Sequence, residues 1–351
     1  MTASRSLRIA VLGVGMMGAD HVTRITSTIS GARVAVVNDY VVEKAARLAA
    51  TIPNCRVVED PFDAIADPDV DAVLLASPGP AHEKQLLACL EHGKPVMCEK
   101  PLTTDVATSL EVVTREAELG TKLIQVGFMR RFDPEYRQLA ALLHSGQLGR
   151  PLLLHCIHRN LSVPPHFDSA MIVKDSLVHE VDVTRFLLNE EISSVQIITP
   201  RPNPRAPEGL RDPQIALFTT TSGMHVDVEV FVTTGVAYEV RTEVVGESGS
   251  AMIGLDVGLI RTSTPGIRSG RITRTFMERF GQAYDIELQR WVDAVRSGSR
   301  TGNYIDGPDA WDGYAAAAVC AAGVESLETG ERVTVEMVQR SSIRSPRTTG
   351  N

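Results

Sequence analysis

The sequence predicts an α/β protein in two parts: an N-terminal doubly wound parallel sheet and a C-terminal α+β domain with a large, mostly antiparallel open sheet. The first part alternates short Val, Ile, Ala and Leu runs with longer segments of helical pattern, which is typical of a parallel sheet covered on both faces. The second part instead carries successive alternating strands with no helix between them. A length of 351 residues, 43% of them hydrophobic, favours two domains over one.

Charge and cysteine content exclude several classes of protein. The formal net charge is −8 and the basic residues are scattered, which argues against a nucleic-acid or anionic-membrane partner. The five cysteines are an odd number without a CxxC pair, and they fit neither a disulfide framework nor a zinc ribbon. The chain starts directly with an apolar strand, and no stretch approaches the roughly 18 apolar residues that cross a bilayer. We therefore expect a cytoplasmic protein.

The first domain, residues 1–126, is expected to hold five apolar strands separated by helices. These strands are residues 7–13, 33–39, 71–77, 94–100 and 121–127. In the turn after the first strand, GVGMMG places Gly13, Gly15 and Gly18 in GxGxxG spacing. The first glycine permits the turn, the second lets the backbone approach a pyrophosphate, and the third allows close helix packing. This arrangement indicates a Rossmann fold that binds a dinucleotide.

Asp39 closes the second strand, about 20 residues beyond the glycines, where a carboxylate accepts hydrogen bonds from the ribose hydroxyls. It would repel a 2′-phosphate, so NAD is favoured over NADP. Two observations keep alternatives open: Asp39 could merely cap the helix that follows it, and Lys44 and Arg47 lie downstream, where they could accept a phosphate.

Lys100 ends the run VMCEK at the carboxyl edge of the predicted sheet, between Glu99 and Pro101. Ligands of open α/β sheets collect at this edge, so Lys100 should point into the nicotinamide crevice. The alternative is a solvated lysine paired with Glu99. Residues 77–83 end the preceding strand and shape the same crevice, with His82 either a ligand or the first residue of a helix. The predicted cofactor-binding residues are Gly13, Gly15, Met16, Met17, Gly18, Asp39, Tyr40, Ser77, Pro78, His82, Glu99 and Lys100.

The second domain, residues 127–338, has strand-like runs and two late amphipathic helices. The runs are residues 151–160, 195–199, 214–220, 224–232, 238–247 and 250–255, and the helices are residues 276–298 and 310–330. Residues 201–213 form a Pro-rich loop within this domain. Because no helix layer follows each strand, we expect self-association to cover the second face of the sheet. The polar tail, residues 339–351, is expected to be disordered.

The segment KDSLVHEVD, residues 174–182, carries the ionisable groups of a predicted helix. At 100° per residue, one side holds Asp175, His179, Asp182 and Phe186, while Leu177, Val181 and Leu188 lie opposite. Three interpretations stay open: a metal site, a buried network with His179 held between two aspartates, and a proton-handling site. The metal site lacks an HExxH-type signature, and no metal is predicted. Proton handling is favoured because Lys100 and the glycine motif supply the other half of a dehydrogenase.

Oxidation of a secondary alcohol needs a base for the hydroxyl proton while carbon delivers hydride to nicotinamide. An imidazole suits that role near neutral pH, so His179 is the predicted base. Asp175 would favour the imidazolium or grip a neighbouring hydroxyl, and Lys100 would donate to the reacting oxygen.

Five motifs in their order and spacing resemble the glucose–fructose oxidoreductase / inositol dehydrogenase / MocA family, and especially its myo-inositol 2-dehydrogenases, over roughly residues 7–335. They are GVGMMG, CEKPL, GFMRRFDPEY, KDSLVHEVD and DGPDAWDGY, together with Asp39 at the strand end. The resemblance implies NAD-dependent oxidation of myo-inositol to 2-keto-myo-inositol (scyllo-inosose), by a homotetramer or dimer. It implies Lys100, Asp175 and His179 as catalytic residues. The substrate-binding residues that it implies are Lys100, Met129, Arg130, Asn160, Asp175, His179 and Tyr238.

Structural alternatives remain for these positions. Arg130 or Arg131 could pair with Asp133 at a helix start, Asn160 could sit in a turn, and Tyr238 could be a sheet residue. The sequence also departs from relatives that carry tryptophan where it has Phe276 and Pro78. The substrate could therefore be another inositol isomer or an aldose, and a dinucleotide-binding sensor without turnover is the alternative from another class.

Overall fold

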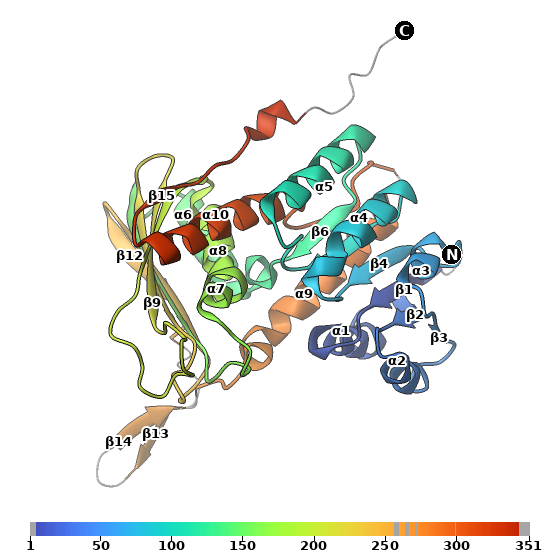
Figure 1. The fold of residues 1–351 in the computed structure, drawn as a ribbon, viewed down its shortest axis with the longest axis horizontal. Helices are drawn as coiled ribbons and strands as arrows, with labels where there is room; N and C mark the ends of the chain where they lie inside the picture. The colour runs from blue at the N-terminus through green and yellow to red at the C-terminus, as the bar shows by residue number, and fades with distance from the viewer. Residues whose placement is uncertain (1–4, 256–259, 264–266, 271, 299, 344–351) are drawn as a thin grey trace. The chain divides into compact units, whose positions relative to one another are not determined.

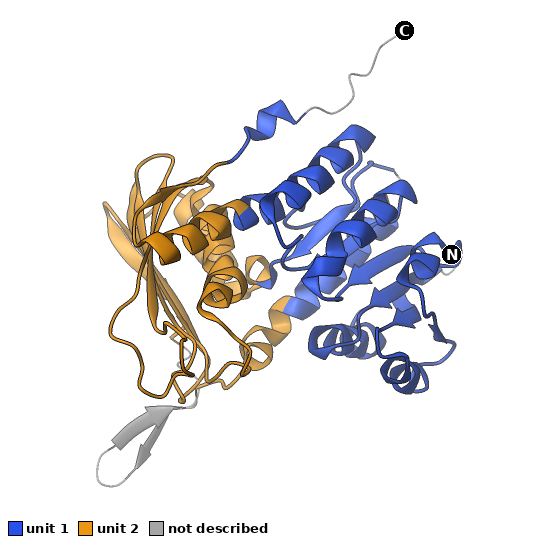
Figure 2. Ribbon diagram, viewed as in Figure 1, with its two compact units in different colours: residues 1–129, 284–317, 337–351 blue, residues 130–283, 318–336 orange. Residues whose placement is uncertain are grey.

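The chain divides into two compact units, coloured separately in Figure 2. The computed structural model describes residues 5–255, 260–263, 267–270, 272–298 and 300–343. Unit 1 comprises residues 1–129, 284–317 and 337–351, and unit 2 comprises residues 130–283 and 318–336.

Unit 1 is built on a six-stranded parallel sheet in the order β3-β2-β1-β4-β5-β6. The strands are β1 (Leu7–Leu12), β2 (Ala32–Asn38), β3 (Arg56–Val57), β4 (Ala72–Leu75), β5 (Val96–Glu99) and β6 (Ile124–Gly127). The connecting helices are α1 (Met16–Ser27), α2 (Val42–Ala49), α3 (Pro61–Ala66), η1 (Gly79–Ala81), α4 (His82–Glu91) and α5 (Val106–Leu119). The predicted doubly wound sheet is confirmed. The chain winds outward in both directions from β1 and β4, and ligands of such sheets bind at the carboxyl ends of these strands.

The core of unit 1 includes residues of a helix from far along the chain. Strands β1 and β4 are buried over almost all their residues, which explains their continuous apolar sequences. Packed into the same core are Leu288, Trp291, Val292 and Val295 of α9 (Phe276–Gly298). Because this apolar face completes the core, residues 284–317 belong to unit 1, and the compact units differ from the contiguous division expected near residue 126.

Unit 2 holds a seven-stranded sheet in the order β12-β11-β7-β10-β9-β8-β15. The strands are β7 (Pro151–Arg159), β8 (Ile192–Ile198), β9 (Gln214–Thr220), β10 (His225–Phe231), β11 (Glu239–Gly246), β12 (Gly249–Ile253) and β15 (Val333–Thr334). β7 and β10 pair in parallel and the other neighbours pair antiparallel, which confirms the predicted mostly antiparallel sheet. A separate pair, β13 (Ile260–Ser263) and β14 (Ile267–Gly270), is antiparallel.

One face of the unit 2 sheet is covered and the other is open. Helices α6 (Pro134–His144), α7 (Ser169–Met171) and α8 (Val178–Leu188) lie on the same side of the sheet (Figure 1). Along β9 and β10, buried residues alternate with half-exposed ones. This period of two matches a sheet packed on one face only.

The C-terminal segment differs from the disordered tail expected from residue 339. Arg340–Ser342 forms a 3-10 turn, η4. Its Arg340 pairs with Asp309 and lies over the ring of Trp311 in α10 (Ala310–Thr329), 5.7 Å from the ring centroid. These contacts, made within unit 1, hold a polar segment that has no apolar pattern of its own. Residues 344–351 lie outside the described residues.

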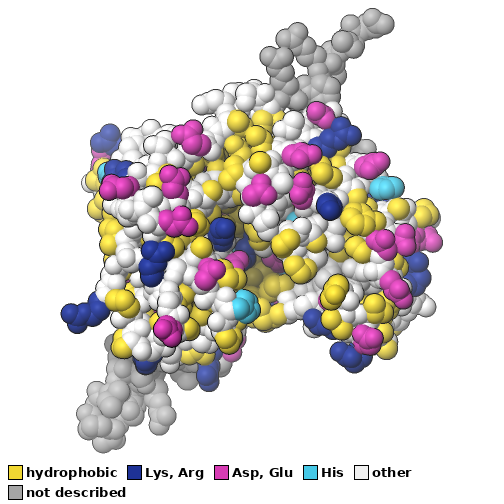
Figure 3. Space-filling view, in the orientation of Figure 1, with side chains coloured by type: hydrophobic (Ala, Val, Ile, Leu, Met, Phe, Trp, Pro, Cys, Tyr) yellow, Lys and Arg dark blue, Asp and Glu magenta, His cyan; other side chains and the backbone are white. Residues whose placement is uncertain are grey.

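Surface charges agree with the sequence analysis. On the face drawn in Figure 3, Lys and Arg side chains are interspersed with Asp and Glu. Among the described residues, no helix has both the length and the apolar character needed to span a membrane.

Candidate functional site

The glycine-rich turn of unit 1 leaves room for a ligand at one position. Gly13 has φ +85°, and a Cβ there would lie 2.5 Å from the Ala76 carbonyl oxygen. A Cβ on Gly18 would lie 1.9 Å from the Gly13 carbonyl oxygen. A Cβ on Gly15, however, would meet no atom within 4 Å. The fold therefore requires Gly13 and Gly18, whereas Gly15 leaves open space before the first turn of α1, where a pyrophosphate fits.

Asp39 lies directly after β2 and braces the glycine turn. Its Oδ2 accepts a hydrogen bond from the Val14 amide at 2.8 Å, and its Oδ1 accepts one from the Val41 amide at 2.9 Å. Lys44 Nζ is 4.0 Å from Oδ2. Tyr40 is 99% exposed and Met16 is 64% exposed, so both predicted cofactor contacts present open surface beside this turn.

His82 joins the two segments that follow β4 and β5. It is the first residue of α4 and is buried. Its Nε2 lies 2.9 Å from the Ser77 carbonyl oxygen, and its Nδ1 lies 2.8 Å from the Pro101 carbonyl oxygen. Both ring nitrogens therefore contact the backbone, and the ring links the two segments. The cofactor contact of His82 stays a prediction. Pro78 is exposed at the start of this region.

Lys100 follows β5 at the carboxyl edge of the sheet, as predicted, and is half-buried. The neighbouring Glu99 is bonded to α1, because its Oε1 lies 2.6 Å from Nε2 of His21. His21 belongs to α1 and is fully buried. Glu99 thus ties the strand that carries Lys100 to the helix that follows the glycine turn.

In unit 2, Asp175 and His179 do not lie on one regular α-helix. Ile172–Leu177 forms a π-helix, η3, and α8 begins only at Val178. The assumed 100° per residue is therefore wrong across this segment, because a π-turn takes more residues than an α-turn. Asp175 and His179 are both half-buried. Within the described residues, no group of three His, Cys, Asp or Glu side chains is placed to hold a metal ion.

Asp182 is set apart from the other two by a buried ion pair. It is 1% exposed and accepts hydrogen bonds from Arg131, with Nη2 at 2.6 Å and Nε at 3.0 Å from Oδ1. One of the two aspartates predicted to hold His179 is therefore also bonded to an arginine. Asp133 does not take either predicted arginine: it caps α6 and pairs with Arg279 at 2.8 Å.

Arg130 is the centre of a second buried pair. Its guanidinium and the Glu180 carboxylate are each 1% exposed and bonded to each other. Burial lowers the pKa of Arg130, but Glu180, Tyr136 and Tyr238 together outweigh burial and hold that pKa well above its ordinary value. Burial likewise raises the pKa of Glu180, and Arg130 and His158 together bring it below its ordinary value. Both groups are therefore charged at neutral pH.

Asn160 and Tyr238 lie beside His158, a residue that sequence reasoning missed. Asn160 directly follows β7, with Oδ1 3.1 Å from His158 Nε2. Tyr238 precedes β11, and its ring makes a T-shaped contact with that of His158, with 5.8 Å between the ring centroids. Phe276, the position of one departure from relatives, lies 6.3 Å from Tyr238 between ring centroids. The alternation along HCIHR, residues 155–159, was a signal that could have found His158. It places His158 on the same buried face of β7 as Cys156. Met129, the remaining predicted substrate residue, is buried.

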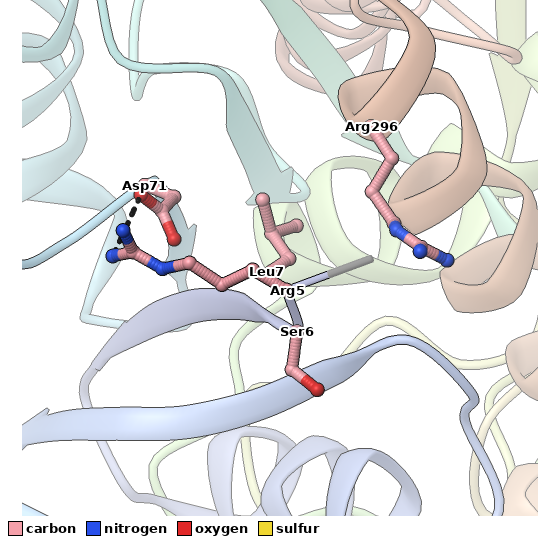
Figure 4. A pocket seen from close by; sticks show the side chains of 5 residues that line it. All are labelled: Arg5, Ser6, Leu7, Asp71 and Arg296. Atoms are coloured by element: carbon pink, nitrogen blue, oxygen red, sulfur yellow. Dashed lines mark ion pairs between the residues drawn. The ribbon is translucent and has the colours of Figure 1, made fainter. Parts of the chain in front are cut away.

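A cavity of about 220 Å³ in unit 1 does not belong to this site. Figure 4 shows its lining residues, with Arg5 reaching towards Asp71, 3.9 Å away, and Arg296 on the other side of Leu7. Leu7 begins β1, so the cavity lies at the amino edge of the sheet. Cofactors of such sheets bind at the opposite, carboxyl edge.

Comparisons with known proteins agree with this geometry. The chain matches the oxidoreductase family with an NAD-binding Rossmann fold over residues 7–128, and the GFO/IDH/MocA C-terminal domain over residues 136–252. It is 74% identical over 352 residues to an inositol 2-dehydrogenase of Rhodococcus jostii, covering 98% of this chain and 96% of that protein. It is 69% identical over 339 residues to an inositol 2-dehydrogenase of Mycolicibacterium smegmatis, covering 96% and 98%.

A solved structure is also similar over nearly its whole length. The myo-inositol dehydrogenase of Lactobacillus casei, in complex with NAD(H) and myo-inositol, aligns with a TM-score of 0.92 at 35% identity, covering 96% of this chain and 99% of that one. The family matches and the sequence identities point to the same family. The glycine turn and the position of Lys100 at the strand end fit it. The chain therefore belongs to the GFO/IDH/MocA family of oxidoreductases with an NAD-binding Rossmann fold.

Proposed function

We propose that this protein uses NAD to oxidise a secondary alcohol of a cyclic polyol, with myo-inositol as substrate and 2-keto-myo-inositol as product. The observation that carries the proposal is the identity to inositol 2-dehydrogenases over nearly the whole chain. The likeness to a structure with NAD(H) and myo-inositol bound supports it. The chain also has Lys100, Asp175 and His179 together, which a sensor without turnover would not need.

Three side chains perform the proposed chemistry. NAD, when bound, supplies the hydride acceptor. His179 takes the proton of the reacting hydroxyl as general base. Asp175 stabilises the imidazolium that forms, because a nearby carboxylate favours the charged ring. Lys100 donates a hydrogen bond to the reacting oxygen and stabilises its negative charge as the ketone forms.

Asn160 and Tyr238 are the proposed contacts for the other ring hydroxyls, and Met129 is a further proposed substrate residue. Polar side chains of this kind discriminate strongly against analogues that lack a hydroxyl, because the protein group is then left unpaired. Arg130 supports these contacts indirectly, because its guanidinium is buried against Glu180 and His158.

Steady-state assays across myo-, scyllo- and chiro-inositol and glucose, each with NAD and with NADP, test the proposed function. We expect the highest kcat/KM with myo-inositol and NAD, because Asp39 would repel the 2′-phosphate of NADP. Activity on glucose alone would remove the inositol assignment. NAD binding without turnover of any polyol would favour the sensor.

Gly15→Ala is expected to weaken NAD binding without unfolding the protein. The added Cβ meets no atom of the chain within 4 Å, so the melting temperature should stay near that of the wild type. The same methyl group would occupy the space in which the backbone approaches the pyrophosphate. Fluorescence titration with NADH measures the loss. Gly281→Ala, whose Cβ also meets nothing within 4 Å, is the matched control, and equal NADH affinity of the two variants would contradict the assignment.

We also propose that the protein is a homo-oligomer that covers the open face of the unit 2 sheet with a second copy. That face carries Leu153, which is 41% exposed, and, farther along β7, Arg159, which pairs with Glu229 at 2.6 Å and with Glu239 at 2.9 Å. Exposed apolar side chains, with the neighbouring charges already paired, suit an interface in which two copies present the same surface to each other. Sedimentation of a monomer at micromolar concentration would refute this. The cytoplasmic location stays a prediction, tested by fractionating cells that express the protein.

A further inference from the structure

A continuous run of buried side chains in unit 2 leads from Arg130 to Asn160. Arg130 Nη1 donates to Glu180 Oε1, and Arg130 Nη2 lies 3.3 Å from His158 Nδ1. His158 Nδ1 is also 3.0 Å from Glu180 Oε2, and on the other side of the ring Nε2 is 3.1 Å from Asn160 Oδ1. His158 is 3% exposed, so water cannot replace a partner that it loses.

The backbone on either side of the Asn160 side chain is already fixed. Its amide donates to the Phe231 carbonyl oxygen at 2.9 Å, and its carbonyl oxygen accepts from Thr234, from the amide at 3.2 Å and from Oγ1 at 2.8 Å. Only the side-chain torsions remain, and the bond to His158 fixes these. The direction of the Asn160 carboxamide therefore depends on the imidazole.

The neighbours of His158 determine which end of that carboxamide faces it. Glu180 can only accept a hydrogen bond and Arg130 can only donate one. When Nδ1 accepts from Arg130, the ring hydrogen is on Nε2. When Nδ1 donates to Glu180 in the doubly protonated ring, Nε2 again carries a hydrogen. In both forms Nε2 donates to Asn160 Oδ1. A neutral ring with its hydrogen on Nδ1 would leave Nε2 as an acceptor and would face the Asn160 NH2 group instead. The structure places Oδ1 at Nε2, which fits the first two forms and turns the NH2 group away from the ring.

His158 also lies next to the proposed reacting group. Its ring centroid is 6.3 Å from that of His179 and 5.8 Å from that of Tyr238. An imidazole with both nitrogens bonded to protein groups is a poor proton acceptor for substrate. Its position instead lets it set the direction of a group that contacts substrate.

We propose that His158 is a positioning residue that presents the Asn160 NH2 group to a ring hydroxyl oxygen and so determines which inositol stereoisomer is accepted. This rests on the proposed function and names a specificity residue within it. A stereoisomer that moves the hydroxyl away from Asn160 loses one directed hydrogen bond. His158 itself transfers no proton.

Two substitutions test the roles of the two ring nitrogens of His158 one at a time. His158→Asn places a polar group near the former Nδ1, facing Glu180, and removes the one that faces Asn160. His158→Gln does the reverse. We expect His158→Asn to raise KM for myo-inositol about tenfold, the effect of one lost directed hydrogen bond, with a much smaller change in kcat. It should also change the ratio of kcat/KM between myo- and scyllo-inositol, and His158→Gln should restore most of the loss.

A double-mutant cycle with Asn160→Ala distinguishes positioning from general support of the fold. In the Asn160→Ala background, His158→Asn should change KM little, because its partner is already gone. Additive effects would overturn the inference, as would equal losses for the Asn and Gln variants with equally lowered melting temperatures. His144→Asn, at the exposed end of α6, is the matched control.

The wild-type protein separates this inference from the proposed function. If it oxidises no inositol, the proposed function fails and the role of His158 fails with it. If it oxidises myo-inositol and the cycle is additive, only the role of His158 fails. NADH titration of each variant shows whether unit 1 has kept its cofactor affinity.

Discussion

Replacing His179 with alanine is expected to lower kcat/KM for myo-inositol by about 10²–10⁴-fold, the range that a positioned general base contributes. NAD affinity should stay close to that of the wild type, because the glycine turn and Asp39 belong to unit 1. His179 is only half-buried at the start of α8, so its loss should leave the packing of Val178 and Val181 intact. Turnover followed by NADH absorbance, with NADH titration alongside, measures both quantities.

The pH dependence provides the sharper test of a base. Only the neutral imidazole accepts a proton, so kcat/KM of the wild type should rise with pH and then level off. In His179→Ala the residual rate should lose this rising limb. His144→Ala is the control, since that histidine is exposed at the end of α6. Unchanged turnover in His179→Ala would exclude it as the base.

Glu180→Ala is expected to lower the free energy of unfolding by about 3–5 kcal/mol, the cost of leaving a buried charge without its partner. The charge left behind is Arg130, 1% exposed, and His158 loses a hydrogen-bond partner in the same step. Urea unfolding at neutral pH measures the change. The matched control is Glu118→Ala, which removes the exposed pair with Arg115 and should cost about 0–1 kcal/mol.

The sign of the pH effect on this pair follows from the lowered pKa of Glu180. A carboxyl group whose folded pKa is below its unfolded pKa contributes stability above the unfolded value, near 4.5. That contribution is lost as pH falls through the folded pKa. The difference in unfolding free energy between the wild type and Glu180→Gln should therefore shrink on acidification below about pH 4.5. A difference that stays constant down to acid-induced unfolding would show that the ion pair does not stabilise the fold.

Local sequence patterns were enough to predict the parts of the site that depend on one short segment. The glycine turn follows from steric needs at Gly13 and Gly18, which the contacts now show directly. Lys100 could be placed at the carboxyl edge because a strand, a lysine and a proline follow one another along the chain. Both sheets were predicted from whether helices separate the apolar runs.

Features that depend on distant partners could not be predicted in the same way. The two adjacent arginines, Arg130 and Arg131, pair with Glu180 and Asp182, about fifty residues away, and not with nearby Asp133. Two consecutive arginines on the 3-10 turn Met129–Phe132 and two carboxylates two residues apart on α8 give no sequence signal of that match. The π-helix before His179 shifts the angular spacing by an amount that an assumed period of 3.6 cannot reveal.

The cofactor domain does not consist of one contiguous segment, because the apolar face of α9 completes its core. A fragment ending near residue 129 would lack Leu288, Trp291 and Val292, and would expose the apolar surface of β1 and α1 that they cover. Such a fragment should aggregate on synthesis. A functional chimera between two relatives must therefore take residues 1–129 and 284–317 from the same parent.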